Sequence, residues 1–245
     1  MTPAVVLGQG VRPVRDLPPS LEVVPLAEFR AAPGTVQRVL VVGSTADVAA
    51  VAAAAPGVPI AFAGARELSR LFALDPSLGT ALRRLERGTA YPVDLGVLEI
   101  AGGRHCFLGT VTAGAGASGG LGFPWAGRSG PVAIAGDRRT IAASGRALVV
   151  ANAQHWGRWT VAPQAAMNDS RLEIQSFGGP RVGLWSLRRA LALGLHTRHP
   201  GVTRMATTVA DVSLPASWKV RRDGIPVGRG GFRVHLDPGG ATLLI

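Results

Sequence analysis

The apolar pattern of the chain changes near residue 90, and this change restricts the fold more than any other feature. Before it, continuous apolar runs at 36–42 and 58–63 alternate with helical patterns at 46–55 and 66–74. Uninterrupted runs of β-branched residues are typical of parallel strands that are buried on both faces. Strands that alternate with helices in this way predict an α/β unit.

After Tyr91, short alternating segments recur at roughly ten-residue spacing between Gly, Pro, Asn and Asp. One helix is expected among them, at 185–195, where leucines follow the helical spacing. The glycine-rich tract at 113–130 is expected to form a flexible loop. The predicted fold class is therefore α/β plus β, with an α/β domain at 1–90 and a larger, mostly-β domain at 91–245.

The charge of the chain is strongly basic. Its 245 residues are 47% hydrophobic and 17% charged, which suits a sizeable core. The net charge is +11, and Lys219 is the one lysine among 26 basic residues. This charge indicates an anionic partner, such as a phospholipid surface, a nucleotide or nucleic acid. A solvated basic surface without a partner explains it equally well, so both interpretations stay open.

Several classes of site and location are disfavoured by the sequence. Cys106 is the single cysteine, which excludes a disulfide framework and a cysteine metal site. His196 and His199 stand beside Pro200 and are interpreted as a loop pair, so no metal ligand is predicted. No signal peptide is recognised, and prolines interrupt the uncharged stretch 48–65. We expect a cytoplasmic protein, with contact at the inner membrane surface left open.

The segment 149–173 carries a specific resemblance. A strand-like run there is followed by an aromatic-glycine turn, an Ala-Pro pair and the Asn168-Asp169 pair. This order resembles the second domain of the diacylglycerol kinase-like lipid kinases, which are related to sphingosine kinases and NAD kinases. Val-Asp-Leu-Gly at 93–96, Asp-Gly at 223–224 and the ending at 232–245 match the same family in order. The resemblance covers about residues 36–245. It implies a Rossmann-like first domain and a sandwich-like second one.

In this family a strand, Gly-Gly-Asp-Gly-Thr and a helix cradle the phosphates of ATP, because backbone amides and the helix dipole attract anions. The matching residues here are Gly43, Ser44 and Thr45, with threonine in place of the aspartate. Asp47 follows two positions later. It either swings in to replace the missing aspartate or serves as a helix cap that competes with a phosphate, and the second interpretation is preferred. The departures point to weakened or abandoned use of ATP.

The second nucleotide motif of the family falls on residues 64–68. Gly64 is retained there, and Arg66 is a candidate to hold a phosphate. The resemblance therefore implies ATP and Mg²⁺ as cofactors if the protein is active. The implied cofactor-binding residues are Gly43, Ser44, Thr45, Gly64 and Arg66.

Asp169 is the acid that stands where the family has an Asp-Asp-Gly motif. The resemblance implies that it accepts the proton of a lipid hydroxyl. A turn aspartate that stabilises the loop before the strand at 172–177 is the structural alternative. The neighbouring Trp156 and Trp159 either face a lipid or pack in the core.

The sequence leaves two alternative functions open. The first is a lipid kinase that phosphorylates a lipid hydroxyl with ATP. The second is a catalytically degenerate relative that binds a lipid, a nucleotide or a protein without phosphotransfer. Nucleic-acid binding ranks last, because no recognised motif accompanies the arginines. A lipid is the expected ligand, and a homodimer stays open.

Overall fold

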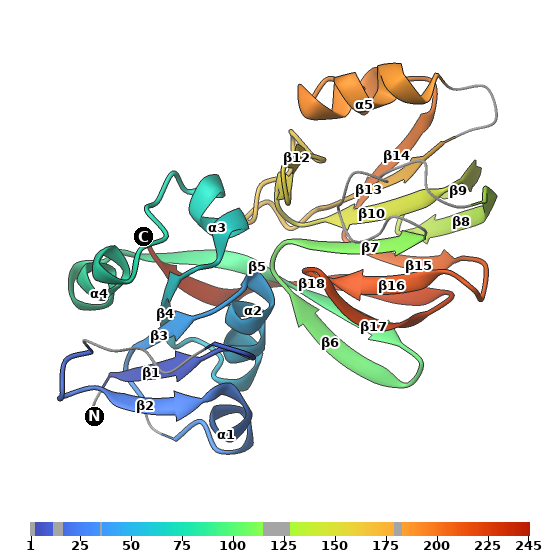
Figure 1. Cartoon of the computed structure of the whole chain (residues 1–245). Coiled ribbons are helices and arrows are strands. Elements are labelled where there is room, and N and C mark those ends of the chain that lie inside the picture. The colour runs from blue at the N-terminus through green and yellow to red at the C-terminus, as the bar shows by residue number, and fades with distance from the viewer. Residues whose placement is uncertain (1–2, 12–16, 35, 115–127, 179–182) are drawn as a thin grey trace. The chain divides into compact units, whose positions relative to one another are not determined.

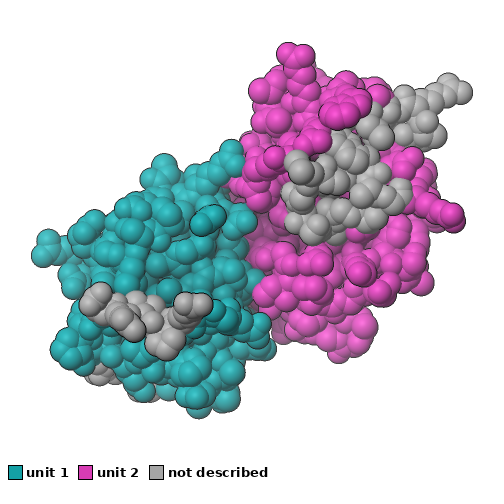
Figure 2. All heavy atoms as spheres, viewed as in Figure 1, with its two compact units in different colours: residues 1–95, 238–245 teal, residues 96–237 magenta. Residues whose placement is uncertain are grey.

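The computed structural model divides the chain into two compact units, which Figure 2 colours separately. Unit 1 comprises residues 1–95 and 238–245, and unit 2 comprises residues 96–237. The expected boundary at residue 90 therefore falls inside a strand, and the last residues of the chain return to unit 1. The residues that the structure describes are 3–11, 17–34, 36–114, 128–178 and 183–245.

Unit 1 contains parallel strands in the order β2-β1-β3-β4-β18. Val39, Leu40 and Val41 of β3 are fully buried, as expected for a strand covered on both faces. The strands are β1 (Ala4–Leu7), β2 (Glu22–Pro25), β3 (Val39–Val42), β4 (Pro59–Ala63) and the end of β18 (Phe232–Leu244). The helices are α1 (Leu26–Ala31), α2 (Thr45–Ala54), α3 (Arg66–Leu71) and α4 (Leu78–Arg87), as Figure 1 shows.

Two details of these helices differ from the sequence expectation. Helix α1 lies in residues 1–35, a proline-rich segment whose sequence predicts short strands and no helix. The Asp-Pro pair at 75–76 predicts a helix that begins at Pro76 behind an Asp75 cap, but α4 begins at Leu78 after Ser77. Asp75 still helps to order this start, because its carboxylate accepts hydrogen bonds at 2.9 Å from the Ser77 amide and from the Thr80 hydroxyl.

Helix α4 is held to β4 by a buried arginine. Arg84 is 6% exposed, and its guanidinium donates to the carbonyl of Phe62 at 2.6 Å. The same guanidinium lies 5.3 Å from the centre of the Phe62 ring. A charged side chain buried in this way needs such acceptors. Arg84 therefore fixes α4 against the end of the strand that carries Phe62.

Unit 2 is built from antiparallel strands in two sheets that enclose one apolar core. One sheet joins β15, β8 and β9 to the first part of β18 and includes β5 and β6, and the other has the order β14-β13-β10-β7-β16-β17. Their bounds are β5 (Ala90–Ile100), β6 (Gly103–Phe107), β7 (Thr110–Gly114), β8 (Gly130–Gly136), β9 (Thr140–Gly145), β10 (Ala147–Ala151), β13 (Leu172–Phe177), β14 (Val202–Thr207), β15 (Val209–Ser213), β16 (Lys219–Arg222) and β17 (Ile225–Arg229).

Strand β10 shows how the alternation of its residues places it between two cores. Leu148 and Val150 point into the core between the sheets, whereas Val149 belongs to a second apolar cluster. Helix α5 (Leu184–Ala192) and the hairpin of β11 (His155–Trp156) and β12 (Trp159–Thr160) contribute to that second cluster. Figure 1 shows α5 beside the sheet that contains β10 and β13.

The alternating pattern of residues 104–112 predicts a single strand, but the structure has β6 and β7 with a break between them. The break is made by Asp223, whose carboxylate accepts hydrogen bonds from the amides of Leu108, Gly109 and Thr110 at 2.8–3.0 Å. These amides therefore bond a side chain rather than a neighbouring strand. Most of the expected loop at 113–130 lies outside the described residues, because 115–127 are not described.

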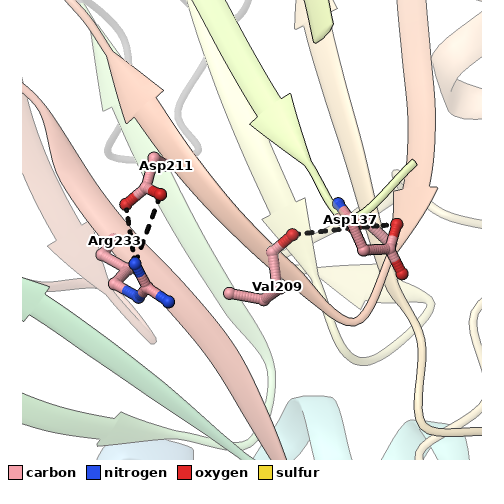
Figure 3. Close-up of polar contacts among 5 residues, drawn as sticks. Asp137, Val209, Asp211 and Arg233 are labelled. Carbon is pink, nitrogen blue, oxygen red and sulfur yellow. Dashed lines mark hydrogen bonds and ion pairs between the residues drawn. The ribbon is translucent and has the colours of Figure 1, made fainter. Parts of the chain in front are cut away.

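Polar contacts also mark the end of β14 and the start of β15 (Figure 3). The Thr207 hydroxyl lies 2.9 Å from Asp137 Oδ1 and 2.7 Å from the carbonyl oxygen of Val209. The hydrogen bond from the Thr207 hydroxyl is the largest cause of the lowered pKa of Asp137. Among the helices that the structure describes, none has the length and apolar character needed to cross a membrane.

Candidate functional site

The parallel strands of unit 1 end in glycines at one edge of the sheet. Gly8 directly follows β1, Gly43 directly follows β3 and Gly64 directly follows β4. Ligands of open α/β sheets bind at this carboxyl edge. Gly64 has φ +84°, and a Cβ atom on it would lie 3.0 Å from the carbonyl oxygen of Gly43. The structure thus brings the predicted residues Gly43 and Gly64 together.

Helix α2 begins directly after Gly43, and its N-terminus is closed by a capping box. Ser44 is the N-cap, and its hydroxyl accepts a hydrogen bond from the Asp47 amide at 3.3 Å. In return, Asp47 Oδ2 accepts hydrogen bonds from the amide and the hydroxyl of Ser44, each at 2.8 Å. This reciprocal pair satisfies donors that a helix start otherwise leaves open. The interpretation of Asp47 as a cap is therefore confirmed.

The Asp47 carboxylate also fills the space between the first two glycines. Asp47 is 4% exposed, and its Oδ1 lies 3.5 Å from the amide of Gln9. A Cβ atom on Gly43 would lie 2.5 Å from Asp47 Oδ2, and one on Gly8 would overlap the same oxygen. The absence of side chains at Gly8 and Gly43 therefore makes room for this carboxylate.

The donor set at this edge does not fit the phosphates of ATP. An anion at a helix N-terminus is stabilised by free amides and by the positive end of the helix dipole. Here the Ser44 amide is bonded to Asp47, and the carboxylate places a negative charge at that same end. Within the described ranges, no three His, Cys, Asp or Glu side chains gather to form a metal site.

Two other residues predicted to bind the nucleotide, Thr45 and Arg66, differ in their exposure to solvent. Thr45 is 4% exposed, and its hydroxyl donates to Glu67 Oε2 at 3.1 Å. This bond connects the first turn of α2 to the first turn of α3. Arg66, the first residue of α3, is exposed. Thr45 thus contributes to the contact between two helices, while the Arg66 side chain reaches solvent.

Asp169, the predicted catalytic acid, lies in unit 2 before β13. The residue is exposed, and its Oδ1 accepts a hydrogen bond from the amide of Arg171 at 3.0 Å. Ser170, between them, has φ +54°. An aspartate that bonds the amide two residues further along the chain orders a turn of this kind. The catalytic role of Asp169 stays a prediction.

A second carboxylate near Asp169 was not singled out in the sequence. Glu173 is half-buried on β13, and burial raises its pKa. The charge of Asp169 raises that pKa further, whereas the charges of Arg204 and Arg171 lower it. Carboxyl groups with a raised pKa are frequent among groups that exchange protons in functional sites. The available signal in the sequence was an acidic residue at the start of a strand, four residues after Asp169.

His196 and His199 form the loop pair that the sequence predicts. His196 is fully buried, and its Nε2 lies 2.8 Å from the Val161 carbonyl oxygen and 2.9 Å from Gln175 Oε1. Burial lowers the pKa of His196. His199 Nε2 lies 3.0 Å from the hydroxyl of Ser186. A serine hydroxyl in contact with a histidine is the arrangement of a nucleophile and its general base.

The hydrogen bonds around His199 exclude that role for neutral histidine. His199 Nδ1 accepts a hydrogen bond from the Gly201 amide at 3.1 Å, so Nε2 carries the proton. Nε2 therefore donates to Ser186 and cannot take its proton. The Ser186 hydroxyl in turn donates to the Gly183 carbonyl at 2.7 Å. The pair connects α5 to the following loop.

No protein-family model matches this chain, and no curated protein matches it in sequence. Solved structures do match its fold. A protein described as a diacylglycerol kinase, from Bacillus anthracis str. Sterne, superposes with a TM-score of 0.80 at 13% identity, over 99% of this chain and 96% of that one. A diacylglycerol kinase structure from the same organism gives 0.74 at 14% identity, with the same coverage.

A more distant likeness is to yeast NADH kinase in complex with NADH. Its TM-score is 0.50 at 8% identity, and the match covers 91% of this chain and 64% of the kinase. At such identities the likeness establishes the fold alone. The chain therefore has the fold of the diacylglycerol kinases and NAD kinases, with an α/β part and a β-rich part, and this expectation is confirmed.

Proposed function

We propose that this protein is a lipid-binding relative of the diacylglycerol kinases that does not transfer phosphate from ATP. Its fold is that of proteins described as diacylglycerol kinases, which supports a lipid as the ligand. The observation that carries the loss of phosphotransfer is the closed N-terminus of α2. There Asp47 Oδ2 lies 2.8 Å from the Ser44 amide and fills the space next to Gly43.

The energetic reason is repulsion combined with the loss of donors. A phosphate that approached the start of α2 would meet a carboxylate instead of open amides. Two unit charges at 4 Å repel by about 4 kcal/mol at an effective dielectric constant of about 20. A nucleotide would have to displace Asp47, which would also break the cap, at a cost of about 1 kcal/mol. Both terms oppose binding of a triphosphate in this place.

The first experiment measures binding and transfer separately in the full chain. Mg²⁺ and ATP are titrated into the purified protein in a calorimeter. Transfer of labelled terminal phosphate to a bacterial lipid extract is then assayed, while lipids that copurify with the protein are identified by mass spectrometry. We expect a bound lipid, no heat from ATP and no labelled lipid. A labelled lipid product would overturn the proposal.

Two variants of Asp47 then test the physical reason. Asp47→Ala removes the carboxylate and opens the start of α2, whereas Asp47→Asn removes the charge but keeps a side chain of the same shape. We expect Asp47→Ala to gain the most binding of ATP or inorganic pyrophosphate, because it removes both the charge and the side chain. Asp47→Asn should gain less, because it removes the repulsion but its amide still fills the space. If Asp47→Ala gains nothing, then the carboxylate is not what excludes the phosphates.

One observation favours the alternative of an active lipid kinase. Glu173 has a pKa raised by burial, and the charge of the nearby Asp169 raises it further. In that alternative Asp169 accepts the proton of the lipid hydroxyl, with Glu173 beside it. Labelled lipid from the wild type, lost in both Asp169→Asn and Glu173→Gln, would favour this alternative. The residues that would then serve the nucleotide are Gly43, Ser44, Thr45, Gly64 and Arg66.

A further inference from the structure

Helix α5 in unit 2 has one face in the core and one face toward solvent. Leu187 and Leu191 are fully buried in the apolar cluster that includes Trp159. Trp185 and Arg188 are not part of that cluster and line a pocket at the surface of the helix. The β11–β12 turn also lines this open pocket of about 420 Å³. The residues that line the pocket are Arg158, Trp159, Trp185, Arg188, Arg189 and Ala192.

Large apolar side chains are exposed on this helix and just after it. Trp185 is 79% exposed, Leu193 63% and Leu195 67%. Among the described residues, Val23 in unit 1 is the one other large hydrophobic side chain with comparable exposure. Single exposed hydrophobic side chains are common on protein surfaces, whereas groups of them mark surfaces that bind a partner. The three side chains in this short segment therefore indicate an interaction surface.

The same surface is basic. The guanidinium of Arg158 lies 4.5 Å from the centre of the Trp159 ring, and that of Arg188 lies 6.0 Å from the Trp185 ring. From residue 174 to residue 210 the sequence contains no Asp or Glu. Arg188 and Arg189 therefore lie in a stretch of sequence that carries no acidic residue. They complement an anionic partner.

We propose that this surface docks on an anionic phospholipid bilayer. We call it the α5 surface, and it comprises Arg158, Trp185, Arg188, Arg189, Leu193 and Leu195. Trp159 also lines the pocket, but it is 3% exposed and belongs to the core beneath this surface. Tryptophan favours the boundary between lipid headgroups and hydrocarbon, and arginine binds lipid phosphates through paired N–H donors. Exposed leucines gain from entry into the hydrocarbon boundary and gain nothing from a nucleic-acid backbone. A bilayer therefore fits the combination better than RNA or DNA.

The inference rests on contacts within unit 2 and does not depend on whether phosphate is transferred. A membrane surface would bring the protein to the lipids of its proposed function whether or not the start of α2 accepts ATP. Failure to dock would leave the proposed lipid binding untouched, since lipid extracted with the protein is measured without vesicles. Failure of ATP binding would likewise leave the docking intact.

Flotation with vesicles tests the proposal on the full chain. Vesicles of phosphatidylcholine alone are compared with vesicles that also contain phosphatidylglycerol. The variants are Trp185→Ser and the pair Arg188→Gln with Arg189→Gln. The matched control is Arg83→Gln with Arg87→Gln, which removes the same charge from exposed positions on α4 in unit 1. Far-ultraviolet circular dichroism verifies that each variant is folded.

We expect the wild type and the control to float with the anionic vesicles. The α5 arginine pair should bind about 30-fold more weakly, because each arginine near an anionic surface contributes about a factor of five. Trp185→Ser should weaken binding severalfold, and added salt should weaken the wild type more than the arginine pair. Equal losses in the control and the α5 pair would overturn the proposal. So would tighter binding to a single-stranded oligonucleotide than to vesicles.

Discussion

Asp47 in unit 1 and Asp223 in unit 2 both accept hydrogen bonds from backbone amides. The donors differ in how far they lie from the aspartate along the chain. Asp47 accepts from Ser44, three residues before it. Asp223 accepts from Leu108, Gly109 and Thr110, more than a hundred residues before it. The first contact closes the start of a helix. The second fixes the β16–β17 turn to the backbone between β6 and β7.

The same hydrogen bonds to a carboxylate therefore serve two different purposes in the two units. At α2 the donors would be available to a ligand if Asp47 were absent, so the side chain substitutes for an anion. At the β16–β17 turn the donors belong to a break between β6 and β7, and Asp223 substitutes for a missing strand partner. We therefore expect Asp47 to control binding and Asp223 to control stability.

The largest expected effect is the loss of Asp223. Asp223→Ala would leave three backbone amides without their acceptor, and one unsatisfied buried donor costs about 1–3 kcal/mol. Because water can reach part of this turn, we expect a loss of about 3–4 kcal/mol in the free energy of unfolding, measured with urea. The control is Asp211→Ala, which breaks an exposed ion pair with Arg233 at 3.3 Å (Figure 3). It should cost less than about 1 kcal/mol, and equal losses would contradict the assignment.

The next effect is a pH dependence from the same carboxylate. Burial of the carboxylate raises the pKa of Asp223 from 3.8 to about 6, although the amides and Arg222 lower it. The folded state therefore holds this proton more tightly than the unfolded state. Stability should fall as pH rises from about 4 to about 6, by up to about 3 kcal/mol, and stay level above that range. Urea unfolding of the wild type and of Asp223→Asn measures it, and only the wild type should show this component.

A smaller effect is expected at Gly43. A Cβ atom there would lie 2.5 Å from Asp47 Oδ2, so Gly43→Ala should force the carboxylate or the strand end to move. We expect a loss of about 2 kcal/mol from this overpacking. In the double variant Gly43→Ala with Asp47→Ala the clash is absent, so the two losses should not add. Additive losses would show that Gly43 does not pack on Asp47.

The fold was largely predictable because it depends on local patterns. Residues 39–42 are uniformly apolar, and β3 is buried on both faces as that pattern predicts. The strands at 147–151 and 172–177 have the predicted bounds. The Ser44-Asp47 cap could also be read from the sequence, because its two partners are three residues apart.

The features that escaped prediction depend on contacts between distant residues. The break in the strand at 104–112 involves a hydrogen bond to Asp223, and no residue near Leu108 in the sequence indicates it. The return of 238–245 to unit 1 depends on pairing of Thr242 and Leu243 with β4. The raised pKa of Glu173 depends on burial against its neighbours, which a sequence does not give.

The smallest expected effect distinguishes the hydrogen bond that Asp47 accepts at the start of α2 from the charge of its carboxylate. Asp47→Ala removes the acceptor of the Ser44 amide, and loss of a cap costs about 1 kcal/mol. Asp47→Asn keeps an oxygen that accepts from this amide and loses the favourable interaction of a carboxylate with the helix dipole, about 0.5 kcal/mol. Thermal unfolding should therefore rank the wild type first, asparagine second and alanine last. If asparagine were as damaging as alanine, then charge rather than hydrogen bonding would hold the site closed, and Asp47→Asn should bind phosphate as well.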